Sequence, residues 1–153
     1  MHIVFSAATP EDFKRLLALR LSVMREHLER LGRFDSDRAR ARFSAGFAPA
    51  FTRLVHLDGA FAGCVTLRPG GEGIELEHFY LRPEFHGQGT GSRILACLLE
   101  ETDQAGQSVH LGVLKQSPAR RFYERHGFVF THAGEFDDYF IRMPRQGTPS
   151  LAR

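Results

Sequence analysis

The chain has 153 residues, of which 42% are hydrophobic and 25% are charged, so it can bury one sizeable core but is too short for two ordinary domains. Its formal net charge of +2 is small and no run of like charges is long, which argues against a nucleic-acid-binding protein. No apolar run approaches the roughly 18 residues of a membrane span, and the N-terminus lacks a signal-peptide pattern. We therefore expect a cytoplasmic protein that binds neither nucleic acid nor membranes.

The first third of the chain predicts one strand followed by helices. Residues 2–7 (HIVFSA) have the pattern of a short strand. A hydroxyl residue, a proline and two acids then give helix-start signals, and a glycine gives a stop signal, which predicts one bent helix or two helices over residues 9–32. A further helix is expected over residues 35–47, entered through Asp35 or Ser36.

The middle of the chain predicts three strands. Residues 51–69 form two β-rich runs around Asp58 and Gly59, a dipeptide that is a strong hairpin signal. Residues 73–83 then alternate between two faces. We expect Ile74, Leu76, His78 and Tyr80 on one face and Glu75, Glu77, Phe79 and Leu81 on the other.

The last third predicts two helices and three strands. A helix with one apolar stripe is expected to end near Gly106, and a strand follows over residues 108–115. The next helix has Ser117 as its N-cap, Pro118 at its first position and Gly127 at its end. Strands over residues 128–132 and 139–143 close a mixed sheet with helices on both faces, and the chain ends in a loose tail, residues 144–153.

The segment PEFHGQGTGSRIL, residues 83–95, places glycines at positions 87, 89 and 91 between a strand and a helix. Glycine loses much conformational freedom on folding, so these positions need a reason such as positive φ or close backbone approach. Free amides at the start of a helix, with its dipole, form a site for an anion such as phosphate. The spacing fits neither a P-loop nor a dinucleotide-binding fingerprint, and a tight turn without a ligand is the alternative.

Two motifs together resemble the GNAT superfamily of N-acyltransferases. The segment LRPEFHGQGTGSRILACLLEE is similar to the superfamily's acetyl-CoA motif, and VLKQSPARRFYERHGF is similar to the motif that follows it at this separation. Two residues depart from the pattern: His86 stands where Arg or Gln is usual, and Ser117 replaces the usual Asn.

The resemblance implies a GNAT fold: an α/β domain over residues 1–143 with a twisted, mixed, mostly antiparallel sheet of about six to seven strands and about four helices. It implies acetyl-CoA as the acyl donor, no metal, and direct transfer to an amine in a ternary complex. The residues that it assigns to cofactor binding are Phe79, Tyr80, Leu81, His86, Gly87, Gln88, Gly89, Thr90, Gly91, Ser92, Ser117, Ala119, Phe122 and Arg125.

Amide formation from a thioester needs a neutral amine, and a lysine-like amine with a pKa of about 10.4 is protonated at neutral pH. A base must therefore remove a proton. The resemblance implies a carboxylate on the strand before the glycine loop, where Glu75 is nearer the usual position and Glu77 is the alternative. Both could instead be solvated carboxylates on a half-exposed strand.

The thioester carbonyl also needs polarisation, which a backbone N–H near Phe79 to Leu81 can supply. A hydroxyl placed near the departing thiolate can return a proton. Tyr123 occupies the superfamily's general-acid position, although packing in the core beside Phe122 is the alternative.

The remaining cysteines, histidines and arginines give weaker predictions of function. Cys64 and Cys97 lie in apolar contexts, which favours two buried thiols over a disulfide. The eight histidines show no metal-ligand spacing. Arginines 120, 121 and 125 lie on one predicted helix, where one could meet a cofactor phosphate and Arg120 could instead pair with Glu124.

The acceptor stays open between an amino acid, a polyamine, a peptide lysine and an aminoglycoside, with a small amine or peptide favoured. The acids Glu135, Asp137 and Asp138 would attract a cation, whereas Arg20 and Arg25 could hold a carboxylate. An acyl-CoA sensor without turnover is the alternative function. Monomer and homodimer both remain open, with the expected strand 139–143 as an edge that could pair with a second copy.

Overall fold

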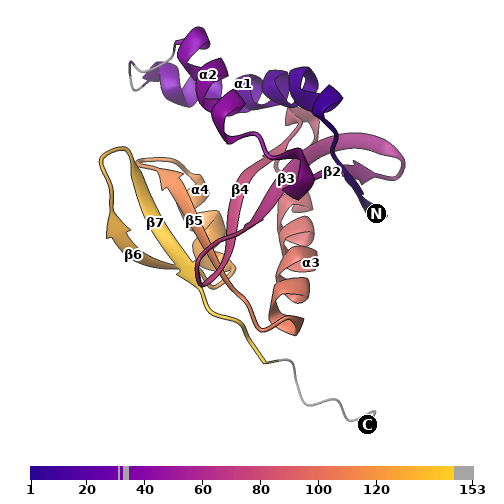
Figure 1. Cartoon of the computed structure of the whole chain (residues 1–153), viewed down its shortest axis with the longest axis vertical. Coiled ribbons are helices and arrows are strands. Elements are labelled where there is room, and N and C mark those ends of the chain that lie inside the picture. Colours follow the sequence, from indigo (N-terminus) through magenta and orange to yellow (C-terminus); the bar gives the residue numbers. More distant parts are fainter. Residues whose placement is uncertain (31, 33–34, 147–153) are drawn as a thin grey trace. The chain divides into compact units, whose positions relative to one another are not determined.

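The computed structural model describes residues 1–30, 32 and 35–146 (Figure 1). Among these residues it contains seven β-strands, four α-helices and three 3-10 helices. The strands are β1 (Ile3–Ala7), β2 (Thr52–Leu57), β3 (Ala60–Pro69), β4 (Gly73–Leu81), β5 (Ser108–Leu114), β6 (Val129–Ala133) and β7 (Asp137–Arg142). The helices are η1 (Pro10–Asp12), α1 (Phe13–Arg30), α2 (Ser36–Gly46), η2 (Pro49–Phe51), η3 (Pro83–Phe85), α3 (Thr90–Gln104) and α4 (Ala119–Arg125).

The strands follow the hydrogen-bonded order β1-β2-β3-β4-β5-β7-β6. β4 and β5 pair in parallel, whereas the pairs β1–β2, β2–β3, β5–β7 and β6–β7 are antiparallel. The predicted fold class, a mixed and mostly antiparallel sheet with four α-helices, is therefore confirmed.

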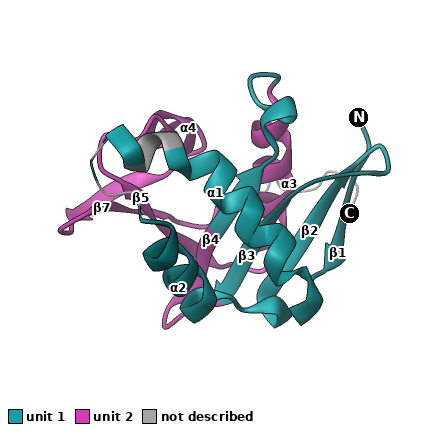
Figure 2. Ribbon diagram, turned by 90° about the horizontal axis from the view of Figure 1, so that it is seen from above, with its two compact units in different colours: residues 1–68, 78–88 teal, residues 69–77, 89–153 magenta. Residues whose placement is uncertain are grey.

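The chain divides into two compact units, shown in different colours in Figure 2. Unit 1 comprises residues 1–68 and 78–88, and unit 2 comprises residues 69–77 and 89–153. The boundary at residue 143 stays a prediction, and most of the predicted tail, residues 147–153, lies outside the described residues.

Unit 1 forms a core between its two α-helices and the strands β2 and β3. Asp35 begins α2 by accepting hydrogen bonds from the amides of Asp37 and Arg38, as expected. The helices then bring together three aromatic rings, with centroids 5.5 to 5.6 Å apart, from Phe13, Phe43 and Phe47. They pack beside buried side chains that include Leu16, Leu17, Leu19, Leu54 and Cys64.

The predicted hairpin joins β2 to β3. Its two turn residues, Asp58 and Gly59, have φ angles of +49° and +86°, as a two-residue hairpin turn with positive φ at both positions requires. The dipeptide therefore acts as the sequence predicts.

In unit 2, α3 carries an apolar stripe and contacts β5. The stripe consists of Ile94, Leu95, Leu98 and Leu99, all of which are buried as predicted. Strand β7, which contains most of the predicted edge strand 139–143, pairs with β5 on one side and β6 on the other. The expectation of an edge strand there is wrong, because β6 and β7 form a hairpin that places β6 outside β7.

The two cysteines differ in exposure. Cys64 is buried, and burial raises its thiol pKa to about 12. Cys97 is exposed, so the expectation of two buried thiols is wrong for this residue. Cys97 falls between Leu95 and Leu98 on α3, on the helix face that the apolar stripe leaves to solvent.

The described helices give no sign of a membrane span, since none is both long and apolar enough to cross a bilayer.

Candidate functional site

Strand β4 carries both predicted bases. Ile74 and Leu76 are buried, whereas Glu75 and Glu77 on the opposite face are half-buried. The parallel ladder with β5 runs from Gly73 to Glu75. The Glu75 side chain lies over Gly70, since a Cβ at Gly70 would come 3.0 Å from its Cγ.

The alternation of β4 is interrupted at His78, which has a φ of +49°. A positive φ is uncommon outside glycine and marks local strain in a strand. The Cys64 thiol donates to the His78 carbonyl at 3.2 Å, and the Tyr80 carbonyl faces Gly63, where a Cβ would not fit. The irregularity thus lies directly before Phe79, the first of the residues whose backbone N–H was expected to polarise the thioester.

The glycine loop leaves β4 through η3. Gly87 and Gly89 both have φ of +75°, and a Cβ at either would meet nothing within 4 Å. His86 donates from Nε2 to the Leu81 carbonyl at 2.7 Å, and Gln88 donates to the Glu84 carbonyl at 3.3 Å. The His86 ring therefore fixes the loop to the end of β4.

Helix α3 begins at Thr90, inside the glycine-rich segment. Its N-cap is Gly89, which supplies no side-chain hydrogen bond to the first-turn amides. Thr90 is buried, and the Ser92 hydroxyl shares a 3.0 Å hydrogen bond with Nε2 of His126, which follows α4 in unit 2. Burial, then the charges of nearby arginines, lower the pKa of His126, so this imidazole is neutral at physiological pH.

Helix α4 carries the second motif. The Ser117 hydroxyl accepts a hydrogen bond from the amide of Ala119 at 3.1 Å. Pro118 is the N-cap, one residue later than predicted. Tyr123 is buried, with 9% of its surface exposed, and its ring centroid lies 5.1 Å from that of Phe122 and 5.5 Å from that of Phe128.

The arginines of this motif divide between two environments. Arg120 pairs with Glu124 at 3.4 Å, as the alternative reading expected, and with Asp138 at 3.6 Å. Arg125 is exposed and lines a cavity of about 520 Å³ in unit 2, together with His126 and Arg145. Arg121, the third arginine of the motif, is exposed as well.

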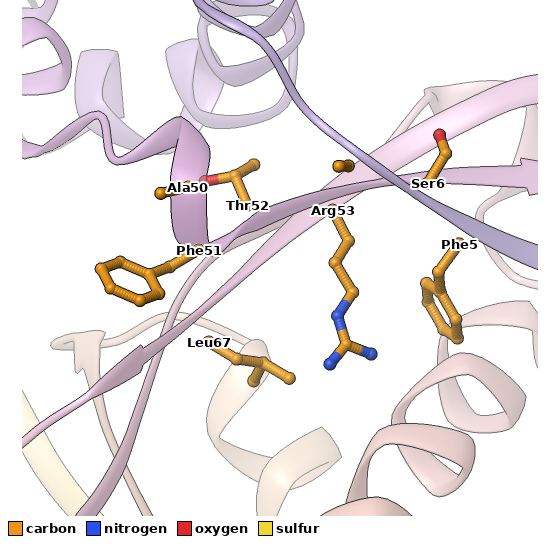
Figure 3. Close-up of a pocket in the computed structure, with 8 residues that line it drawn as sticks. Phe5, Ser6, Ala50, Phe51, Thr52, Arg53 and Leu67 are labelled. Atoms are coloured by element: carbon orange, nitrogen blue, oxygen red, sulfur yellow. The ribbon is translucent and has the colours of Figure 1, made fainter.

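A second cavity, of about 430 Å³, lies in unit 1 and contains no predicted site residue. Figure 3 shows the Arg53 side chain extending between Phe5 and Leu67. The Arg53 guanidinium carbon lies 5.7 Å from the centroid of the Phe5 ring. This cavity is distinct from the residues of the two motifs.

The part of the chain that the structure describes contains no group of three or more His, Cys, Asp or Glu side chains placed to hold a metal ion.

Three features of the site were missed by sequence reasoning. These are the positive φ of His78, the hydrogen bond between Ser92 and His126, and a 2.8 Å hydrogen bond from Nη1 of Arg20 to the hydroxyl of Tyr80. The two hydrogen bonds join residues 34 and 60 positions apart, for which no local pattern exists.

Comparison with known proteins supplies the family. The model of the acetyltransferase (GNAT) domain matches residues 51–130, just over half of the chain. A search among curated proteins finds no significant match.

Solved structures with the same fold are numerous. The PaiA N-acetyltransferase of Thermoplasma acidophilum, in complex with coenzyme A, superimposes with a TM-score of 0.73 at 18% identity, covering 94% of this chain and 99% of that one. A putative N-acetyltransferase from Lactobacillus plantarum gives 0.68 at 20% identity, covering 94% and 98%. N-acetylglutamate synthase of Neisseria gonorrhoeae, complexed with coenzyme A and L-arginine, gives 0.65 at 16% identity, covering 94% of this chain and 34% of that longer one.

Proposed function

The chain belongs to the GNAT family of acetyltransferases, and from this premise we propose that it transfers the acetyl group of acetyl-CoA to a primary amine. The acceptor is a small molecule or a peptide, and its amine attacks directly in a ternary complex. The observation that carries the proposal is the start of α3, where Gly89 caps the helix without a side chain and leaves the first-turn amides to an anion.

The residues present fit coenzyme A. The positive φ angles and open space at Gly87 and Gly89 let the backbone approach a pyrophosphate without a Cβ in the way. Gln88 and residues 90–92 continue this cradle, and Arg125 offers an exposed guanidinium. The solved relative that holds coenzyme A supports the same assignment.

The other cofactor contacts are proposed on both sides of the glycine loop. Ser117, Ala119 and Phe122 of the second motif are assigned to the cofactor by the resemblance. Backbone N–H groups of Phe79 to Leu81 are proposed to polarise the thioester, because the irregularity at His78 interrupts the regular strand immediately before them. Acetyl-CoA itself supplies an acyl group activated as a thioester.

Two side chains of unit 2 are proposed to move protons. Glu75, or alternatively Glu77, takes the proton of the incoming amine, directly or through a water. Both carboxylates lie on the face of β4 opposite the buried Ile74 and Leu76, and solvent reaches them. Tyr123 returns a proton to the leaving thiolate. Its burial beside Phe122 and Phe128 holds the ring in one orientation.

The same proposal places the enzyme in the cytoplasm as a monomer or homodimer. Its alternative is a sensor that binds acyl-CoA without turnover. The enzyme and the sensor differ in their need for Tyr123 and for Glu75 or Glu77. Transfer uses these side chains to move protons, whereas a sensor needs none of them.

The test is release of free thiol from acetyl-CoA in the presence of amines, amino acids, peptides and aminoglycosides. Amine-dependent release is expected, and Tyr123→Phe and Glu75→Gln should each lower kcat by about 100-fold, within the range for loss of a general acid or base. Glu124→Gln, on the exposed face of α4, is the matched control. Release that is insensitive to both variants would contradict their assigned roles.

A further inference from the structure

Arg20, on α1 of unit 1, is a cation without an anionic partner among the described residues. Its Nη1 donates to the Tyr80 hydroxyl at 2.8 Å. Its Nε is buried and has no hydrogen-bond partner in the part of the chain that the structure describes. A guanidinium carries five donors, so most of the hydrogen-bonding capacity of Arg20 is not used by the described residues.

Other arginines of unit 1 pair with acids. Arg15 pairs with Asp12 at 2.8 Å, Arg25 with Glu29 at 2.9 Å, and Arg82 with Glu84 at 2.9 Å. These three arginines are exposed, where an ion pair contributes little. Arg20 is half-buried, where a charge without a partner costs far more free energy. Arg20 thus lacks a carboxylate partner among the residues that the structure describes.

The surroundings of Arg20 suit an anion. Its guanidinium carbon lies 6.0 Å from the ring centroids of both Phe43 and Tyr80, which limit access of water. His78 contacts both of these aromatic residues. Its Nδ1 lies 3.4 Å from the Tyr80 hydroxyl, and its ring centroid lies 5.1 Å from that of Phe43. Burial, then the charges of Arg20 and Arg68, lower the pKa of His78 to about 4. His78 is therefore neutral at neutral pH, and the positive charge beside the Tyr80 hydroxyl is that of Arg20.

We propose that Arg20, with the hydroxyl of Tyr80, binds a carboxylate of the acceptor. The guanidinium fork matches a carboxylate geometrically, and partial burial strengthens the pairing. The acceptor is then an amino acid or a peptide with a free carboxylate, and a polyamine is a poorer substrate. The substrate class rests on the proposed function.

The position of Tyr80 links this site to the proposed chemistry. Its backbone belongs to the segment assigned to the thioester, and its hydroxyl contacts Arg20. A carboxylate bound to Arg20 is therefore separated from the Tyr80 backbone by about the length of the tyrosine side chain. An acceptor whose amine and carboxylate are separated by several bonds, as in L-lysine reacting through its side chain, spans this separation.

The experiment compares L-lysine with cadaverine, which differs from it only by the carboxylate. The wild-type protein should give a higher kcat/KM with L-lysine. Arg20→Gln should lower the ratio of the two kcat/KM values by about tenfold to 100-fold, the range for one charge-assisted hydrogen bond. Arg25→Gln is the matched control on the same helix, since Arg25 already pairs with Glu29. An equal ratio in the wild type and Arg20→Gln would overturn the proposal.

A binding measurement keeps this test independent of turnover. In ¹⁵N NMR spectra of the wild-type protein, the Arg20 Nε–H signal, identified by its absence from Arg20→Lys, should shift on titration with L-lysine or acetate and not with cadaverine. A shift without any turnover would uphold the carboxylate site and reject the proposed function. No shift with either carboxylate would reject the site, whatever the protein acetylates.

Discussion

At the residue scale, the two cysteines should differ sharply in reactivity. Only the thiolate reacts with disulfide reagents. Cys97 is exposed, whereas burial raises the pKa of Cys64 to about 12. At neutral pH we expect one thiol of the folded protein to react with a chromogenic disulfide and the second to react only after unfolding in denaturant.

The variant Cys97→Ser provides the control for that measurement. It should show no rapid labelling while folded and one thiol when unfolded. Rapid labelling of the folded variant would mean that Cys64 is accessible, contrary to its burial in the core of unit 1. Cys97→Ser is also the better background for a thiol-release assay, because its folded form adds no signal.

Residues with local signals were the ones that the sequence could predict. Asp35 caps α2, the Asp58–Gly59 turn has positive φ, and Gly87 and Gly89 adopt the positive φ that their positions suggested. His78 gave no such signal, because a histidine inside an alternating strand has no reason of its own to leave the β region. Contacts such as that of Arg20 with Tyr80 depend on the fold and have no local signature.

At the element scale, the glycine loop and the start of α3 are predicted to bind the pyrophosphate. Gly89→Val places a branched side chain at a φ of +75°, in front of the first-turn amides. We expect the affinity for acetyl-CoA, measured by calorimetry, to fall at least tenfold, because the side chain blocks the amides that an anion would use.

The matched control for the loop is Gly59→Val in the β2–β3 hairpin. Gly59 has a φ of +86° and open space, so both variants carry a similar strain of about 1 to 3 kcal/mol. Only the loop variant should lose affinity. Equal affinity of the two variants, with both shown to be folded by circular dichroism, would count against the cradle.

Helices were predicted well where capping residues and apolar periodicity agree. The order of the strands in the sheet was predicted less well, because it depends on which strands pair. The apolar stripe of α3 correctly predicts which face of this helix is buried. The order of the last strands could not be obtained this way, since β7 inserts between β5 and β6 through contacts distant in sequence. Helix α4 starts one residue late because the Ser117 hydroxyl caps the amide of Ala119 while Pro118 takes the N-cap position.

At the scale of the whole molecule, the ion pair with the least exposed arginine lies in unit 2. Arg142, with 4% of its surface exposed, donates from Nη1 and Nη2 to the two carboxylate oxygens of Asp103 at 2.6 and 3.0 Å. The pair joins α3 to β7. The His126 carbonyl accepts from Nε of Arg142 at 3.0 Å, so every nitrogen of this guanidinium is used.

Asp103→Asn should destabilise the protein by about 3 kcal/mol, the low end for breaking a buried pair, because Asp103 itself is partly exposed. Urea unfolding at pH 7 measures the loss. Glu124→Gln, which removes an exposed pair with Arg120, should cost less than about 1 kcal/mol. Similar losses in the two variants would show that the Asp103 pair is not a major contributor to stability.

The same pair sets a pH dependence. Hydrogen bonds from Arg142 hold the pKa of Asp103 below its ordinary value, so the folded state binds this proton less readily than the unfolded state does. The stabilisation is therefore complete above the unfolded pKa of about 3.9 and is lost as the pH falls through the lower, folded pKa. Between pH 7 and pH 3 the gap in stability between wild type and Asp103→Asn should narrow.

The fold class of the whole chain followed from two motifs and the order of its elements, because glycine spacing, helix caps and alternation are local properties. The acceptor did not follow from sequence. Its recognition depends on side chains such as Arg20 and Tyr80, which come together only in the folded protein.

We propose that this chain transfers the acetyl group of acetyl-CoA to an amine. The most direct measurement is mass spectrometry of amines incubated with the protein and acetyl-CoA labelled in its acetyl group. We predict that one class of amine gains the labelled acetyl group in step with release of free coenzyme A, and that Tyr123→Phe slows both. Tight binding of acetyl-CoA with no labelled amine from any class would contradict transfer and favour a sensor.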